Sequence, residues 1–476
     1  MRIWLACGLA LCLSGCAAFR SYDKSLLQSV DQAASGNLDG AISQLNAANP
    51  GPAKDLLYYL ELGMLQRLAS RFADSQKTWT IAALRIQGAD ATPVDAIGNA
   101  LRGASSYLVN DRLRSYPGYD YEKTMLLTLM ALNQLSMGEW DRARVAIRQT
   151  HELEAQIEEE HGKQVATVEE DAKKRGARTS FKELNGYPIQ TIDSPEVNAL
   201  RNSYQSALSH YLAGFVYEAL GEASLAAPGY RLANELQPGQ PLLEEALRGL
   251  DERLSAPNDS LTDVLFVVES GAAPALQSRQ FSLPVPTISG SVLVTVSFPV
   301  MAASGPLSAP TRLAVDGARS LELAPIASID LMARRRLKDD MPQIMLRAAV
   351  RSASRAVLQQ GLNNSSRGND QAAAGAALAS LAVAFGSLVT EQADERTWRT
   401  LPSSISIARV RLPAGSHVVT LGERSAPVNI SGRYAVVDLR LLRNRLFVNA
   451  PAAPAPSTGG VPQTLDQVPQ PKEVKQ

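Results

Sequence analysis

The chain has very few cysteines, and their positions exclude most cysteine chemistry. Of three cysteines in 476 residues, Cys7 and Cys12 lie within a 15-residue leader that export removes. Only Cys16 then remains, so a disulfide framework and a cysteine metal site are both excluded. We therefore expect stability to come from hydrophobic cores, which a chain of this length can build.

Excess charge and clustered histidines are also missing. Lys and Arg total 47, as do Asp and Glu, so the surface as a whole does not attract nucleic acid. No His-Glu-x-x-His spacing, Gly-rich phosphate loop or Gly-x-Ser-x-Gly elbow occurs. Paired carboxylates such as Asp339-Asp340 lie in charged helical surroundings, which is typical of a solvated face. We expect no enzyme activity, no cofactor and no metal. The four histidines are His151, His161, His210 and His417.

The apolar run at the start is too short for a permanent membrane helix. It covers Ile3–Leu13, follows the positive charge of Arg2, and ends in Leu13-Ser14-Gly15-Cys16. These features are typical of a secretory signal. The last four residues resemble the lipobox of bacterial lipoproteins, which implies acylation of Cys16, cleavage before it and a stable membrane anchor. An ordinary signal peptide with a chance cysteine is the alternative.

The lipoprotein resemblance also implies a location. An Asp directly after the lipidated cysteine favours the inner membrane, whereas this chain has Ala17, which points to the outer membrane. We expect residues 16–21 to be a lipidated linker on a periplasm-facing protein. The expected partners are the membrane, through Cys16, and a periplasmic protein or peptide, with proximity to peptidoglycan and no nucleic acid.

Residues 22–255 read as paired helices with a recurring phrase. Its small central residue falls at Ala41, Ser75 and Ala143, in steps of 34 and 68 residues, and a missing copy would centre near Val109. A 34-residue helix–turn–helix period is the tetratricopeptide repeat (TPR) signature. Small residues let the two helices approach, and a large residue four positions later fills the groove. The expected packing residues are Ala41, Leu45, Ser75, Trp79, Ala143, Ile147, Gly214, Tyr217, Ala226 and Tyr230.

A charged insert interrupts the repeat at about 151–195. Residues 151–175 have helix-forming composition with charge on all sides, so the insert is either a solvated spacer or a partner-specific arm. TPR-like arrays bind proteins through a concave face. Several aromatic residues suit either that face or the core of a hairpin. They are Tyr58, Tyr59, Tyr107, Tyr204 and Tyr211.

Residues 262–449 have a different sequence pattern, which predicts short strands separated by Pro and Gly. Residues 264–268 are apolar and mostly β-branched, as in a buried strand, and the strand spacing favours a β-sandwich. A helical hairpin is expected at about 328–396. Its uncharged run, Gln371–Thr390, favours a helix docked on the core, with membrane insertion as the alternative. The Pro-rich residues 450–476 should be a disordered tail. The expected fold is a multidomain α+β protein, an N-terminal TPR-like solenoid followed by this sandwich-like domain with its inserted hairpin.

Two phrases in the β-rich half carry a further resemblance. They are Glu269-Ser270-Gly271-Ala272-Ala273-Pro274 and the run from Ala393 to Pro402. Both resemble an uncharacterised family of bacterial TPR-containing outer-membrane lipoproteins, in which Glu-x-Gly-x-x-Pro follows the first strand and Ala-Asp-x-Arg-x-Trp-x-x-Leu-Pro precedes the later ones. That resemblance implies the architecture and no catalytic residues. The matching positions are Glu269, Gly271, Pro274, Ala393, Asp394, Arg396, Trp398, Leu401 and Pro402.

The two phrases allow two interpretations. In the first they form a structural joint, where Trp398 caps a core and Arg396 pairs with Asp394 or Glu269. In the second, Glu269, Arg396 and Trp398 contact a peptide or glycan. The sequence favours a lipid-anchored scaffold or accessory factor that binds a partner through its array in envelope assembly. The alternatives are a cell-wall glycan enzyme with Glu269 as the acid, and a membrane-inserting assembly subunit.

Overall fold

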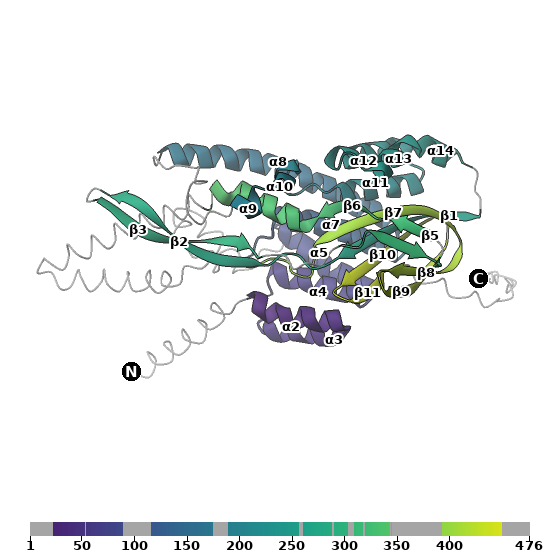
Figure 1. Ribbon diagram of the computed structural model, residues 1–476, viewed down its shortest axis with the longest axis horizontal. Helices are drawn as coiled ribbons and strands as arrows, with labels where there is room; N and C mark the ends of the chain where they lie inside the picture. The colour runs from purple at the N-terminus through teal and green to yellow at the C-terminus, as the bar shows by residue number, and fades with distance from the viewer. Residues whose placement is uncertain are drawn as a thin grey trace, which may run out of the picture.

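The computed structural model describes residues 22–52, 54–88, 116–174, 189–256, 260–287, 290–302, 309–317, 319–342, 344 and 393–449. Several expectations lie outside these residues: the leader with Cys16, the run Gln371–Thr390, Tyr107, and the tail at 450–476. Within the described ranges, the expected mixture of helix and sheet is confirmed (Figure 1).

The N-terminal part is built from helical hairpins, each made of a first and a second helix. The hairpins are α2–α3, α4–α5, α7–α8 and α11–α12, followed by two short helices, α13 and α14. The bounds are α2 Tyr22–Ser35, α3 Leu38–Ala48, α4 Leu56–Leu68, α5 Phe72–Ile86, α7 Asp120–Ser136, α8 Trp140–Lys174, α9 Ile189–Ile192, α10 Pro195–Ala199, α11 Ala207–Ala219, α12 Ala223–Leu236, α13 Pro241–Arg248 and α14 Leu250–Ser255.

The turn inside each hairpin has the same backbone geometry. Gly36, Ser70, Gly138 and Gly221 all have positive φ, and each lies five residues before the small residue of the repeated phrase. In every case the next N–H donates back to a carbonyl five residues earlier, over 2.8–2.9 Å. This left-handed cap satisfies the last carbonyls of the first helix and stops it. The repeat is therefore visible in the backbone as well as in the sequence.

Close contact between the two helices explains the small residues. A Cβ on Gly214 would lie 2.5 Å from the ring of Tyr230, and one on Gly63 would clash with the indole of Trp79. The gap between first and second helix is filled by that aromatic ring, so no side chain fits opposite it. All ten expected packing residues are buried.

Neighbouring hairpins stack through the second helix of one and the first helix of the next. Helix α3 contacts α4, α5 contacts α7, and α8 contacts α11. Because α5 touches α7 directly, the hairpins α4–α5 and α7–α8 are neighbours. The copy expected near Val109 falls mainly on residues outside the described ranges, and no such copy is needed to join these two hairpins.

The charged insert begins as a continuation of α8. Residues 151–163 are mostly exposed, and Lys163 donates to Glu159 one turn away over 2.6 Å. Glu154 and Ile157 are the buried exceptions. This part of the insert is therefore a helix with one face on the array and the rest in solvent.

The strands form three sheets. A five-stranded sheet has the order β11-β10-β1-β7-β6, a four-stranded sheet the order β5-β4-β8-β9, and β2 pairs only with β3. Strand β1 runs parallel to β10 and antiparallel to β7. The bounds are β1 Leu261–Ser270, β2 Leu276–Thr287, β3 Gly290–Met301, β4 Arg312–Val315, β5 Arg319–Glu322, β6 Ala324–Ser328, β7 Ser404–Pro413, β8 Gly415–Leu421, β9 Arg424–Ile430, β10 Tyr434–Leu442 and β11 Arg445–Asn449.

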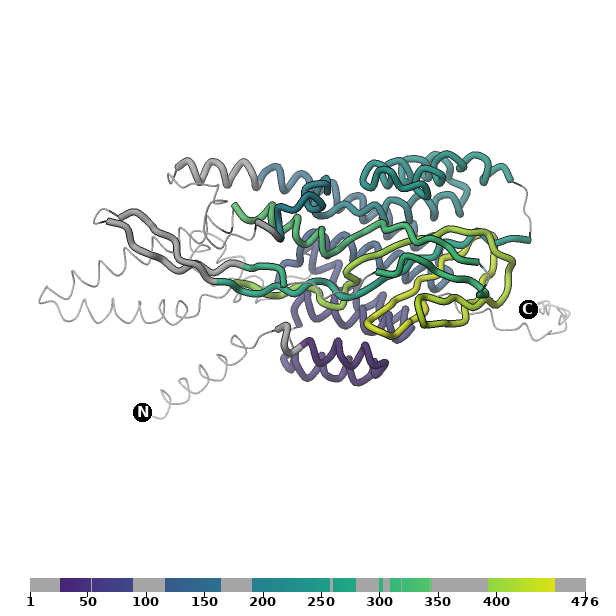
Figure 2. Tube along the Cα trace, in the orientation of Figure 1, coloured from purple at the N-terminus to yellow at the C-terminus, as the bar shows by residue number. Residues whose placement is uncertain are grey.

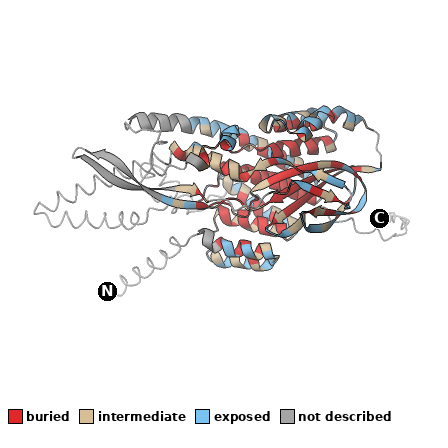
Figure 3. Cartoon of the chain, in the orientation of Figure 1, coloured by how far each residue is buried: buried red, intermediate tan, exposed pale blue. Residues whose placement is uncertain are grey.

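The helices and sheets form three layers rather than separate domains. One face of the five-stranded sheet packs on the four-stranded sheet, and buried apolar side chains of both sheets form one cluster. The other face packs on the hairpins, and one continuous core runs from Leu57 in α4 through Phe215 in α11 to Leu265 in β1. Figures 2 and 3 show late strands beside early helices and the buried residues along this junction. The array and the β-rich half thus share one core, because each of them has an apolar face that the other buries.

The expected helical insertion begins as a helix over residues 329–342. Its arginines are tied down: Arg334 pairs with Asp330 over 2.7 Å and Arg335 with Asp339 over 3.0 Å. Lys338 reaches Asp193 near α10 over 2.6 Å. In the described part of the chain, no helix combines the length and apolar character needed to cross a membrane.

Candidate functional site at the helix–sheet junction

The two sequence phrases meet in space. Ser403 N–H donates to the carbonyl of Ser270 over 2.8 Å, and Ala273 N–H donates to that of Leu401 over 2.7 Å. Gly271 has a φ of +71°, and a Cβ there would overlap the Ser403 hydroxyl. Only glycine fits this turn without strain. The turn after β1 is therefore hydrogen-bonded to the segment that leads into β7.

Residues 397–400 lie across the first helices of two hairpins and are held by buried carboxylates. Glu61 of α4 accepts from the N–H groups of Arg399 and Thr400 over 2.7 and 3.2 Å. Glu122 of α7 accepts from the N–H of Trp398 over 2.7 Å. The array thus binds this segment of its own chain through main-chain N–H groups.

Trp398 anchors the same segment through its side chain. It is fully buried, and its ring meets that of Trp79 edge-on, with 5.8 Å between centroids. Its indole N–H donates to Thr400 Oγ1 over 3.0 Å, so its polar atom is satisfied. The second-helix residue that fills the α4–α5 hairpin is therefore also the platform for Trp398.

Arg396 has its partner within the same phrase. Its guanidinium binds the two carboxylate oxygens of Asp394 over 2.7–3.1 Å and lies 5.4 Å from the ring of Tyr116. Of the two partners that the sequence allowed, Asp394 is the one used. This bidentate pair fixes the entry of the segment into the junction.

Glu269 belongs to a buried charge cluster between α4 and the sheet. Its carboxylate lies 3.5 Å from Arg67 of α4 and 3.7 Å from Arg440 of β10. Arg67 also binds Asp438 of β10 and Asn133 of α7. Burial and the charge of Glu269 raise the pKa of Asp438, and burial lowers that of Arg440. Sequence reasoning missed Arg67, Asp438 and Arg440.

A second charged cluster ties α11 to the sheet. Arg409 of β7 binds Asp263 of β1 over 2.7 and 2.9 Å and Glu218 of α11 over 2.7 Å. Glu218 also accepts from the Tyr230 hydroxyl over 2.6 Å and from Arg253 over 2.7 Å. Desolvation opposes ionisation of Glu218, but the two arginines outweigh it and lower its pKa. This cluster was also missed.

The carboxylates that hold residues 397–400 titrate abnormally. Burial raises the pKa of Glu61 to about 8, and the donors from Thr400 and Arg399 offset only part of that rise. Burial likewise raises the pKa of Glu122 to about 7, against the donors from Trp398 and Tyr116. Desolvation is the dominant cause in both, because the first helices lie between their partner helices and the sheet.

These contacts join the first helices of the array to the five-stranded sheet. Glu269 and Trp398 are 0% exposed, and Arg396 is engaged by Asp394. No surface is left on Glu269 for a substrate to reach. Among the described residues, no group of three His, Cys, Asp or Glu side chains is placed to hold a metal ion. One signal pointed to this junction: the sequence of α7 is apolar on nearly all sides, as in a helix buried all round.

Comparisons with known proteins add little to this geometry. No family model and no curated protein sequence matches the chain. Among solved structures the chain is similar to a tetratricopeptide repeat protein of Parabacteroides merdae, with 14% identity, a TM-score of 0.13, and coverage of 48% of this chain and 98% of that one. The repeat described above therefore rests on the chain's own hairpin geometry.

Proposed function

We propose that this protein is a lipid-anchored, non-catalytic scaffold of the bacterial cell envelope, facing the periplasm at the outer membrane. The leader and Cys16 support the anchor and the compartment. Glu269 would be the catalytic acid if the protein were a glycan-cleaving enzyme. Its carboxylate is instead paired with buried arginines, which supports a binding role over hydrolysis. A glycosidase needs two carboxylates that its substrate can reach.

The partner surface differs from the one the sequence suggested. The concave face of a TPR array is formed by first helices, and here those helices are covered by the five-stranded sheet. Twelve of the 13 residues of α11 are buried. We therefore assign the partner surface to the second helices, which face outward.

One observation carries that assignment. Ile81 and Leu84 of α5, Val145 of α8 and Leu225 of α12 are exposed by 36–52%. Relative to the small residue of each hairpin they occupy offsets of +6, +9, +2 and −1, which are spaced by three or four residues and so share one helical stripe. Three hairpins thus present large apolar side chains from the same side of their second helices, although at different heights along them, as protein-binding surfaces do. We call these four residues the outer stripe.

A crosslinking experiment tests the proposed function. The Ile81→Ser/Leu84→Ser chain, expressed in its own cell envelope, should lose a crosslinked partner that the parent captures. Val418→Ser, which removes a similarly exposed apolar residue from β8, is the matched control and should keep it. Equal crosslinking by all three chains would overturn the outer stripe as the partner surface. Cys16→Ala should release the protein into the soluble periplasm, and membrane retention would contradict anchoring through Cys16.

A further inference from the structure

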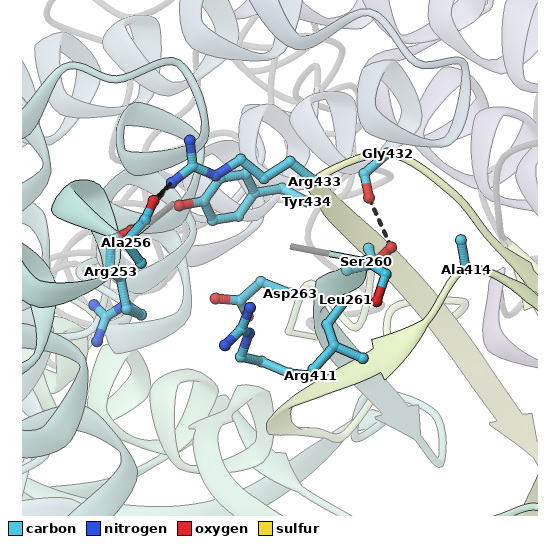
Figure 4. A pocket seen from close by; sticks show the side chains of 11 residues that line it. Arg253, Ala256, Ser260, Leu261, Asp263, Arg411, Ala414, Gly432, Arg433 and Tyr434 are labelled. Carbon is cyan, nitrogen blue, oxygen red and sulfur yellow. Dashed lines mark hydrogen bonds between the residues drawn. The ribbon is translucent and has the colours of Figure 1, made fainter. Parts of the chain in front are cut away.

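A cavity of about 400 Å³ opens at one end of the sandwich, next to the charged cluster of Arg409, Asp263 and Glu218. It lies where β1 and β10 begin, where β7 ends, and beside the last residues of α14 (Figure 4). Its volume is within the usual range of small-ligand sites. Its lining residues include Leu261 and Ala414, which are apolar, together with Tyr434 and several charged side chains.

Most of the charged side chains that line the cavity are arginines. Three arginines, Arg253, Arg411 and Arg433, face one acid, Asp263. Asp263 is already bound on both carboxylate oxygens by Arg409. This carboxylate is thus engaged by a residue that does not line the cavity.

Arg253 and Arg433 are in different states. Arg253 is neutralised by Glu218, with contacts of 2.7 and 3.0 Å. Arg433 donates to the carbonyl oxygens of Arg253 and Ala256 over 3.1 and 3.4 Å, and its guanidinium lies 5.6 Å from the ring of Tyr434. Within the described ranges no carboxylate pairs with Arg433. Both carbonyl contacts use a single nitrogen, so the guanidinium keeps further donors for another group.

The contacts of Arg433 hold it ready for a ligand. Two carbonyls at the end of α14 and the face of Tyr434 restrict an otherwise mobile side chain (Figure 4). A restricted guanidinium has less conformational entropy to lose on binding. Its planar donors match a carboxylate, which accepts two parallel hydrogen bonds from such a group.

We propose that this cavity is a binding site for a small carboxylate ligand, with Arg433 as the principal contact and the apolar wall around Leu261 taking the rest of the molecule. The carboxylate comes from a peptide C-terminus or from a free organic acid. The site goes beyond the scaffold function proposed above, and its binding is measured on the isolated protein, so either proposal can fail alone.

Calorimetric titration of the mature Cys16→Ala chain tests the site. The probes are N-acetyl-trialanine with a free C-terminus, the same peptide as its amide, succinate, and inorganic phosphate. Saturable binding of the free peptide or of succinate, but not of the amide, supports the proposal, and the better of the two identifies the source. Binding of the amide as tight as that of the free peptide, tighter binding of phosphate than of either carboxylate, or no binding by either carboxylate overturns it.

Two variants at one position connect that binding to Arg433. Arg433→Ala should weaken carboxylate binding about ten- to a hundredfold, because a charge-assisted contact is lost. Arg433→Lys should weaken it less, since an ammonium keeps the charge but not the planar pair of donors. Arg424→Ala, at an exposed arginine of β9, is the matched control and should bind like the parent. Unchanged binding by Arg433→Ala, with folding verified by circular dichroism, refutes the site.

Discussion

The two faces of the five-stranded sheet are buried by different means. Toward the four-stranded sheet, β1 presents Val264, Phe266 and Val268, which join a cluster of apolar side chains from both sheets. Toward the helices, alternate residues of the same strand include Asp263 and Glu269, which meet arginines. The apolar interface is non-directional and supplies stabilisation in proportion to the area buried. The face toward the helices is also largely apolar, but its buried ion pairs add geometric requirements, so we infer that they fix the position of the array on the sheet.

Arg67→Ala should have the largest effect on this comparison. It leaves Glu269 and Asp438 buried without Arg67, and loss of one partner from a buried ion pair costs about 3–5 kcal/mol. Urea unfolding of the mature chain measures the change. Arg71→Ala, which removes an exposed pair with Asp39 just past the end of α4, is the control and should cost about 0–1 kcal/mol. Equal losses in the two variants would show that the buried cluster has no special weight.

Leu439→Ala tests the apolar face of the sheet, and we expect its loss of stability to be the second largest. Leu439 of β10 is fully buried between the two sheets, and its truncation removes apolar contacts and leaves a cavity. Such a change costs about 2–4 kcal/mol. The cost should be the same at pH 5 and pH 8, because Leu439 and the apolar side chains around it do not titrate. A cost that varies strongly between these pH values would mean that the two faces of the sheet are energetically coupled.

The pH dependence of Glu61 distinguishes the two kinds of burial by the shape of a stability curve rather than by the loss in one variant. Its pKa is about 8 in the folded chain, above its ordinary value of 4.5, so the folded state holds the proton more tightly. The contribution to stability is therefore complete below about pH 4.5 and is lost as the pH rises through 8. The parent should lose up to about 1.4 kcal/mol per pH unit within that window from this group.

Glu61→Gln removes that titration. The variant should gain stability relative to the parent as the pH rises from 5 to 8, as measured by denaturant unfolding at each pH. Glu159→Gln, at an exposed position of α8, should run parallel to the parent across the range. A difference between Glu61→Gln and the parent that stays constant with pH would mean that Glu61 is ionised throughout.

Much of the helical part was predictable because its information is local. A small residue, a positive-φ position five residues before it and an aromatic or aliphatic residue four after it define each hairpin, as at Gly138, Ala143 and Ile147. The continuous apolar run at residues 264–268 likewise predicted a strand buried on both faces. The interpretation of the two phrases as a structural joint was based on the turn-forming residues Gly271 and Pro274, and this signal is local too.

The partners of those residues were not predictable from one sequence. Arg67 meets Asp438 across 371 positions, and Glu122 meets Trp398 across 276. A charged residue in a helix reads as a solvated face unless the surface covering it is known. Glu61 and Glu218 were unremarkable in the sequence for that reason, although the structure buries both.

The sequence by itself determined the hairpins and the strands, because periodicity and caps are set by near neighbours in the chain. The tertiary structure decided that the array and the sheet share a core, that the array's first helices hold the chain's own residues 397–400, and that the outward surfaces are the second helices and the arginine-lined cavity. The reason is physical: an apolar face must be buried, but which surface buries it depends on contacts hundreds of residues apart.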